Sequence, residues 1–326
     1  MTTRRQLLAA LSLSALTPRA TLAQQSARVY RIGFLGAATA ASYGKRVEAL
    51  RLALRDLGYL ENRNVIYEYR WTEGNNQLLP EMAAQLVGAR CDVIVTGGTP
   101  AILALKQATD TLPIIMAESG DAVAAGLVKS LARPGGNVTG MTHFSPELTA
   151  KRLELLKETM PRLARVAYLV DPDSRITPHQ IAALEHASDL LRVKFQVFGS
   201  RNLNDFPNTF SAIAKARMQG VVTAEDTVHS NNYDLIAALA LRNKIPSIGG
   251  KAFADSGGVI GYGVNFLDQY RRVAVHVQKI LNGTRPADIP VEQPTRFEFV
   301  VNMKTARTLR IKIPHSILLR AGEVIE

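Results

Sequence analysis

The chain has 326 residues, a formal net charge of +11, 47% hydrophobic and 21% charged residues, and one cysteine. This length is about twice that of an ordinary α/β domain, and the composition excludes a disordered or fibrous protein. One cysteine, Cys91, excludes an internal disulfide. The basic residues are scattered along amphipathic segments without a zinc-finger or RNP-type pattern, so we expect no nucleic-acid partner.

The first 23 residues have the organisation of a signal peptide. Arg4 and Arg5 precede an apolar stretch from Leu7 to Leu16, and the small-residue exit at 21–23 follows. No segment reaches the ~20 apolar residues of a transmembrane helix, so we expect export without stable membrane insertion. The arginine pair also resembles the twin-arginine motif, and both that route and the general secretory route stay open. No cysteine near the cleavage region offers a lipid anchor, so we expect a diffusible periplasmic protein.

From Val29 onward, β-branched runs alternate with amphipathic helical segments, which is typical of βαβ units around a parallel sheet. Strands of the first half are predicted at 29–35, 65–69, 93–96 and 114–116, and helices at 46–57, at 79–87 and from 100 onward. Strands of the second half are predicted at 166–170, 195–198 and 221–223, and helices at 148–160, 181–191 and 213–218. The sequence therefore predicts an α/β protein with two Rossmann-like lobes that have parallel sheets.

Three later segments are predicted to cross between the lobes, near Thr142, Val264 and Ile289. They are a strand after the turn cluster at 133–137, a glycine-rich strand at 257–263, and the proline-dense segment 286–294 before a strand at 297–301. The predicted first lobe is 28–142 plus 264–285, and the predicted second lobe is 143–263 plus 286–326. Such a three-stranded hinge permits closure of two rigid lobes around a ligand.

Sequence motifs of common enzyme classes are absent. The chain has no GxGxxG after its first strand, no P-loop, no GxSxG elbow and no HExxH, and its six histidines show no metal-ligand spacing. We therefore expect no catalytic residues, no cofactor and no metal site.

Polar residues follow the predicted strands, where open parallel sheets bind their ligands. The predicted ligand-binding residues are Thr39, Ser42, Thr96, Gly98, Thr99, Glu118 and Asp121 from the first half, and Asp171, Ser174, Glu225, Asp226, Lys251 and Tyr262 from the second. Thr99, Ser174 and Asp226 fit equally well as helix N-caps, and Tyr262 fits equally well as a core or hinge residue. The excess of acids predicts a ligand with an amine or many hydrogen-bond donors.

Residues 132–140 (ARPGGNVTG), 151–157 (KRLELLK) and 286–292 (PADIPVE) closely resemble ABC transporter substrate-binding proteins of the tryptophan/tyrosine type. The similarity extends over essentially the whole mature chain. It implies a type I periplasmic-binding fold and a non-enzymatic subunit that carries a small polar ligand, an amino acid or related compound, to an ABC permease and its ATPase. Glu118 departs from the family, which usually has a small apolar residue there, so the ligand itself is not carried over. We expect a monomer.

Two alternatives from other classes stay open, a periplasmic sensor that presents its ligand to a membrane kinase and a secreted α/β enzyme. A regulator of the LacI type has a related fold, but it needs an N-terminal helix-turn-helix where this chain has a signal peptide.

Overall fold

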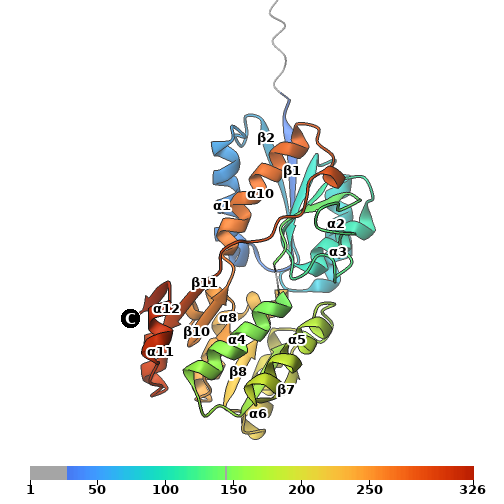
Figure 1. Cartoon of the computed structure of the whole chain (residues 1–326). Coiled ribbons are helices and arrows are strands. Elements are labelled where there is room, and N and C mark those ends of the chain that lie inside the picture. The colour runs from blue at the N-terminus through green and yellow to red at the C-terminus, as the bar shows by residue number, and fades with distance from the viewer. Residues whose placement is uncertain (1–27, 144) are drawn as a thin grey trace, which may run out of the picture.

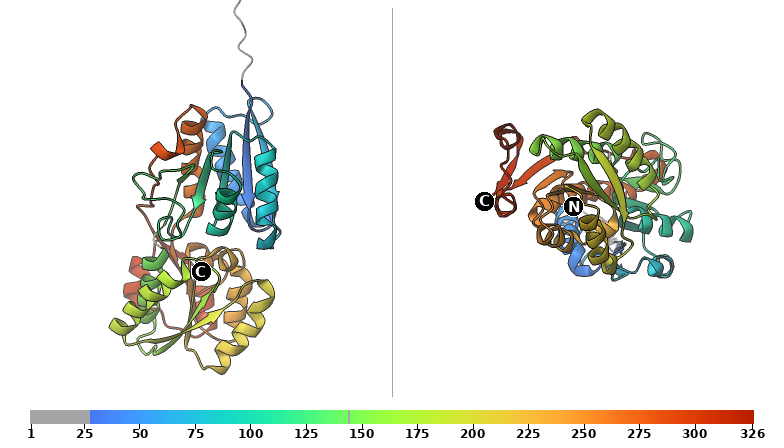
Figure 2. Two further views of the ribbon diagram at one scale, coloured as in Figure 1. Left: turned by 90° about the vertical axis from the view of Figure 1, so that its right-hand side faces the viewer. Right: turned by 90° about the horizontal axis from the view of Figure 1, so that it is seen from below.

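The computed structural model describes residues 28–143 and 145–326, so the predicted signal peptide lies outside the described residues. Two α/β lobes are stacked one above the other, and several chain segments run between them (Figures 1 and 2). The prediction of two α/β lobes is confirmed. The lobe with the N-terminal strand is called the first lobe below, and the other is the second lobe.

The first lobe contains a parallel sheet of five strands in the order β2-β1-β3-β4-β5. Its strands are β1 (Tyr30–Gly36), β2 (Val65–Trp71), β3 (Val93–Gly97), β4 (Ile114–Glu118) and β5 (Val138–Gly140). Its helices are α1 (Ala40–Asp56), α2 (Leu79–Gly88), α3 (Thr99–Ala108) and, from late in the chain, α10 (Phe266–Leu281), with short 3-10 turns at Asn76–Leu78 and Pro286–Asp288.

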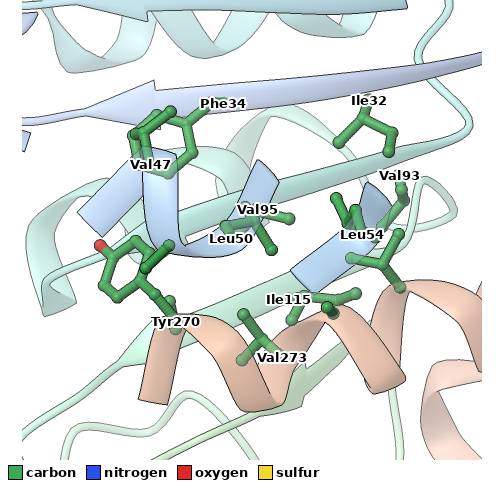
Figure 3. Close-up of a cluster of buried hydrophobic side chains, with 14 of the residues drawn as sticks. Ile32, Phe34, Val47, Leu50, Leu54, Val93, Val95, Ile115, Tyr270 and Val273 are labelled. Atoms are coloured by element: carbon green, nitrogen blue, oxygen red, sulfur yellow. The ribbon is translucent and has the colours of Figure 1, made fainter. Parts of the chain in front are cut away.

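Helices cover both faces of this sheet, which explains why β3 and β4 are buried along their whole length. On one face, α1 contributes Tyr43, Val47, Leu50 and Leu54, whose spacing of three and four residues forms one apolar stripe. Tyr270 and Val273 of α10 complete this core beside Phe34, as Figure 3 shows. The opposite face is covered by α2 and α3.

The second lobe contains seven strands in the order β12-β11-β10-β9-β8-β6-β7. They are β6 (Arg165–Val170), β7 (Lys194–Gly199), β8 (Gly220–Thr223), β9 (Ser247–Gly249), β10 (Ile260–Gly263), β11 (Glu298–Asn302) and β12 (Glu323–Ile325). Its helices are α4 (Ser145–Thr159), α5 (Thr177–Leu191), α6 (Phe206–Lys215), α7 (Thr227–Ser230), α8 (Tyr233–Arg242), α9 (Lys251–Asp255), α11 (Met303–Thr308) and α12 (His315–Arg320), with a 3-10 turn at Leu203–Asp205. The pairing of β10 with β11 is antiparallel, so this sheet is mixed rather than purely parallel as predicted.

The junction between the lobes differs from the prediction at its third crossing. Residues 286–292 pack on the first lobe, because Ile289 and Val291 lie in its two core clusters. The Thr139 hydroxyl also donates to the Ile289 carbonyl at 2.7 Å, and Met141 forms a bridge with Glu292. The chain therefore leaves the first lobe after Glu292 and not near Ile289. The other two crossings follow β5 and β10, as α4 and α10 begin on the opposite lobe.

Candidate functional site

A cavity lies between the lobes at the carboxyl ends of both sheets. It has a volume of about 30 Å³. Two cavities of about 460 and 380 Å³ adjoin it and share lining residues with it. The central cavity is lined by residues from the loops after the strands, from the first crossing and from the start of α10: Gly98, Thr99, Pro100, Glu118, Ser119, Gly120, His143, Asp171, Ser174, Ile176, Glu225, Asp226, Thr227, Ser230 and Phe266.

The structure brings seven of the predicted ligand-binding residues to this central cavity: Gly98, Thr99, Glu118, Asp171, Ser174, Glu225 and Asp226. Thr39 and Ser42 line the adjoining cavity of about 380 Å³, where the Thr39 hydroxyl also caps α1. These nine residues come from both lobes, as expected for a ligand held between them. Their contact with a ligand stays a prediction.

The four remaining predicted residues do not line the central cavity, and each has another partner. Thr96 lies within β3, and its hydroxyl donates to the Leu35 carbonyl at 2.8 Å. Asp121 caps the turn that follows it, accepting hydrogen bonds from the backbone N–H groups of Val123 and Ala124. Both residues were predicted because they lie at the end of a strand. That position does not determine the direction in which a side chain points.

Lys251 and Tyr262 belong to the other edge of the second lobe. The Lys251 ammonium lies 3.1 Å from Asp255 and 3.6 Å from Glu323, near the C-terminal strand β12. The Tyr262 ring packs edge-on against Phe299, in the core or hinge role that the sequence left open. Neither residue is among those that line the central cavity.

Glu118 ends β4 and is buried. Its Oε1 accepts a hydrogen bond from Arg46 Nη1 at 3.1 Å, and the Arg46 guanidinium in turn lies over the rings of Tyr43 and Phe266. Burial raises the pKa of Glu118, Arg46 counteracts this shift, and Glu225 of the second lobe adds to it. The other carboxylate oxygen, Oε2, has no hydrogen-bond partner among the described residues.

Glu225 follows β8 and forms a fully buried ion pair with Arg152 of α4, whose side chain is 0% exposed. Arg152 Nε also donates to the Tyr262 carbonyl at 2.8 Å. This arginine therefore contacts both Glu225 at the cavity and β10, the strand before the second crossing. Burial alone would lower the pKa of Arg152, but Glu225 raises it overall, and the guanidinium stays charged. Within the described chain, Glu225 Oε1 and Arg152 Nη1 have no hydrogen-bond partner.

The two glutamates therefore form a matched arrangement across the cavity. Each lobe contributes one buried carboxylate, each is held by an arginine of its own lobe, and each keeps one unpartnered oxygen. Both glutamates line the same cavity, and Glu225 adds to the rise in the pKa of Glu118, as expected for two like charges in one cavity. Buried carboxylate oxygens without donors are costly, and a ligand ammonium group would supply the missing hydrogen bonds.

Asp226 and Asp171 form the acidic rim of the cavity in the second lobe. Burial would raise the pKa of Asp226, but His229, whose Nδ1 lies 2.7 Å from Asp226 Oδ2, lowers it overall. Burial and the neighbouring Asp226 raise the pKa of Asp171 to about 6. Asp226 also accepts from the His229 backbone N–H, so the capping role that the sequence left open for it is confirmed.

Gly98 is the N-cap residue directly before α3 and has a φ of 89°, a left-handed conformation that favours glycine. A Cβ at Gly98 would lie 2.4 Å from the Thr227 hydroxyl of the second lobe, so only glycine lets the lobes approach this closely. The first turn of α3 also leaves the N–H groups of Thr99 and Ala101 without intrahelical partners. Such a helix start suits a ligand carboxylate.

The sequence reasoning missed the partners of these acids, Arg46, Arg152 and His229, and also His143. Arg46, Arg152 and His229 lie on helices, and His143 lies on the first crossing. Arg152 did carry a signal, because it lies four residues after Leu148 and three before Leu155, on the buried stripe of its helix. A charged residue on such a stripe needs a buried partner, although the spacing does not reveal which one.

Neither a metal centre nor a membrane span is visible in the described part of the chain. Residues 28–143 and 145–326 contain no group of three or more His, Cys, Asp or Glu side chains that fits a metal ion. In the same residues, no helix is both long enough and apolar enough to cross a bilayer.

Comparisons with known proteins agree on one family. Residues 38–325 match the sequence model of the family described as ABC transporter substrate binding protein. The chain is 25% identical over 258 residues to a tyrosine-binding protein of Clostridioides difficile. The aligned segment covers 79% of this chain and 74% of the relative.

Two solved structures are also similar to this chain. One is an ABC domain in complex with L-Trp from Streptococcus pneumonia, with 26% identity, a TM-score of 0.84 and coverage of 91% of this chain and 100% of the other. The second is a conserved domain protein from Vibrio cholerae, with 26% identity, a TM-score of 0.86 and the same coverage. The predicted type I periplasmic-binding fold is confirmed. The matched family is one of binding proteins rather than enzymes, and the chain belongs to it as a substrate-binding protein of an ABC transporter.

Proposed function

We propose that the chain is the exported subunit of an importer, that it encloses a small amine-bearing solute between its lobes, and that it delivers this solute to a permease driven by an ATPase. The observation that carries the proposal is that Glu118 and Glu225, one from each lobe, line the same cavity and that each has one unpartnered oxygen among the described residues. An ammonium group between them would neutralise charge that burial makes unfavourable. The ligand would then favour the closed arrangement, because only there do both carboxylates reach it.

An α-amino acid supplies the second group that the cavity suits. Its carboxylate would lie at the start of α3, beside the N–H groups of Thr99 and Ala101. The names of two relatives make L-tyrosine and L-tryptophan the first solutes to try. A cavity of about 30 Å³ has room for one or two water molecules, so a solute of this size needs a wider lobe separation or the adjoining cavities.

The first test compares amino acids with analogues that lack only the amine. We expect calorimetry to detect binding of L-tyrosine or L-tryptophan, and at least about tenfold weaker binding of the deaminated analogue that keeps the ring and the carboxylate. At 100 times its Kd, the bound amino acid should stabilise the protein by ~2.7 kcal/mol in a thermal shift. Equal affinity for an amino acid and its deaminated analogue would refute the ammonium role of the two glutamates.

Export has its own test. The organisation of residues 1–23 supports cleavage after Ala23, so N-terminal sequencing of the protein from a periplasmic extract should begin near Gln24. A variant with Arg4 and Arg5 replaced by Gln should stay inside the cell at full length. An uncleaved cytoplasmic wild-type chain would contradict export while leaving the ligand proposal intact.

A further inference from the structure

Asp171 is the one acidic residue of the central cavity that forms no ion pair with a described residue. Four acids line this cavity. The other three, Glu118, Glu225 and Asp226, are each paired with a cation of their own lobe. The charge of Asp171 is therefore left for a group that does not belong to the protein.

The position of the Asp171 side chain is fixed by its own turn. The residue directly follows β6 and is 8% exposed. Its Oδ1 accepts from the Asp173 backbone N–H at 3.0 Å, and its carbonyl accepts from the Thr177 hydroxyl at 2.8 Å. Oδ2 has no hydrogen-bond partner in the described part of the chain, and it is not fully enclosed by protein atoms. This oxygen is open to a ligand in the cavities that Asp171 lines.

Asp171 also lies at the passage from the central cavity to the adjoining cavity of about 460 Å³. The residues that line both are Thr99 and Pro100 of the first lobe and Asp171 and Ser174 of the second, and Asp171 is the one charged residue among them. The cavity of about 380 Å³ shares a single lining residue, Thr227, with the central cavity. The central cavity has room for one or two water molecules, so an amino acid with its carboxylate at Thr99 extends its side chain through this passage.

The two arginines of the larger cavity do not neutralise Asp171. Arg201 is paired with Asp173 at 2.9 Å, and both of these side chains are exposed. Arg175 is exposed and forms no ion pair with a residue that the structure describes. Burial and the charge of Arg175 lower the pKa of Lys106 on α3, which places this guanidinium near the first lobe's lysine.

A ligand cation beside Asp171 would stabilise its ionised form. Burial and the charge of Asp226 raise the pKa of Asp171 to about 6, so its carboxylate is less easily ionised than in water. An amino acid with an uncharged side chain adds no net charge to the cleft and leaves this carboxylate uncompensated. A second ammonium group on the ligand compensates it.

We propose that Asp171 determines specificity for the side chain of the solute, and that the solute is a diamino acid of the type of L-ornithine or L-lysine. The inference rests on the proposed function, which places the α-amine and the carboxylate, and it adds the site of the distal amine. Leu103 lies among the mostly polar walls of the larger cavity. Such walls suit a short aliphatic chain that ends in an ammonium group.

Calorimetry with two matched pairs of amino acids tests the proposal at neutral pH. L-Lysine and L-norleucine differ only in the distal ammonium group, and so do L-ornithine and L-norvaline. We expect the wild type to bind at least one diamino acid at least about tenfold more tightly than its uncharged counterpart, since a charged hydrogen bond is gained. Asp171→Asn should bind that diamino acid at least about tenfold more weakly and its counterpart equally well.

The amide of Asp171→Asn keeps an acceptor for the Asp173 N–H and removes a charge beside Asp226, so the melting temperature should not fall. The matched control is Asp189→Asn, which removes the same charge from an exposed position in the last turn of α5 and should leave every affinity unchanged.

Two sets of outcomes separate this inference from the proposed function. The inference alone is overturned if amino acids bind more tightly than their deaminated analogues but neither diamino acid is favoured over its counterpart. It is also overturned if Asp171→Asn keeps the preference, or if Asp189→Asn loses as much of it. If no amino acid binds, or if amino acids and their deaminated analogues bind equally, the proposed function fails together with the inference.

Discussion

Arg152→Met should lower the free energy of unfolding by about 3–5 kcal/mol, the usual cost of removing one partner from a buried ion pair. Arg152 and Glu225 have side chains that are 0% and 1% exposed, so the remaining carboxylate would have neither water nor a cation beside it. The substitution also removes the donor to the Tyr262 carbonyl, at the strand that precedes the second crossing. Urea unfolding of the ligand-free protein measures the loss.

Two further variants separate the charge effect from lost packing. Replacing both partners, in Arg152→Met/Glu225→Met, should recover most of the stability, because two apolar side chains need no compensation. Lys151→Met, one residue earlier on the same helix, removes a cation from an exposed pair with Glu154 and should cost less than about 1 kcal/mol. If the double variant is no more stable than Arg152→Met, unpaired charge is not the reason for the loss.

The fold was predictable because most of its strands are continuous apolar runs of ordinary length. β3 and β4 are buried on both faces and stand out from their surroundings. β9 and β12, which have three residues each, were missed. The antiparallel pairing of β10 with β11 was also missed, since strand direction depends on how the chain returns from the first lobe and not on local sequence.

The site was predictable only where its residues follow strands. Parallel strands bring their carboxyl ends to one edge, so Glu118, Glu225 and Asp226 could be expected near one another. The arginines that balance the two glutamates lie on helices 72 and 73 positions away in the chain, and sequence spacing does not report contacts over that distance. The sequence therefore predicted an acidic cleft but not the arginines beside its glutamates. The predicted charge of the cleft was more negative than the charge in the structure.

Glu118→Gln should weaken the binding of L-tyrosine or L-tryptophan, whichever the wild type binds, at least about tenfold. Losing one partner of a buried charged hydrogen bond costs ~2–5 kcal/mol, and the retained amide oxygen softens this loss. The side chain keeps its shape and its place at the end of β4, but it no longer attracts an ammonium group. Calorimetry on the purified variant measures the change.

The affinity of Glu118→Gln for the deaminated analogue distinguishes a lost ammonium contact from a disturbed cleft. The analogue has no ammonium group, so its affinity should be no lower for Glu118→Gln than for the wild type, since the variant removes a negative charge near the ligand. Asp121→Asn is the matched control, because the structure places that carboxylate at the cap of its own turn and not at the cavity. Glu118→Gln also leaves the Arg46 guanidinium without its anion, which lowers the stability of the free protein and is measured separately by urea unfolding. Equal losses for the amino acid and its deaminated analogue would mean that the substitution disturbs the cleft through Arg46 and not through an ammonium contact.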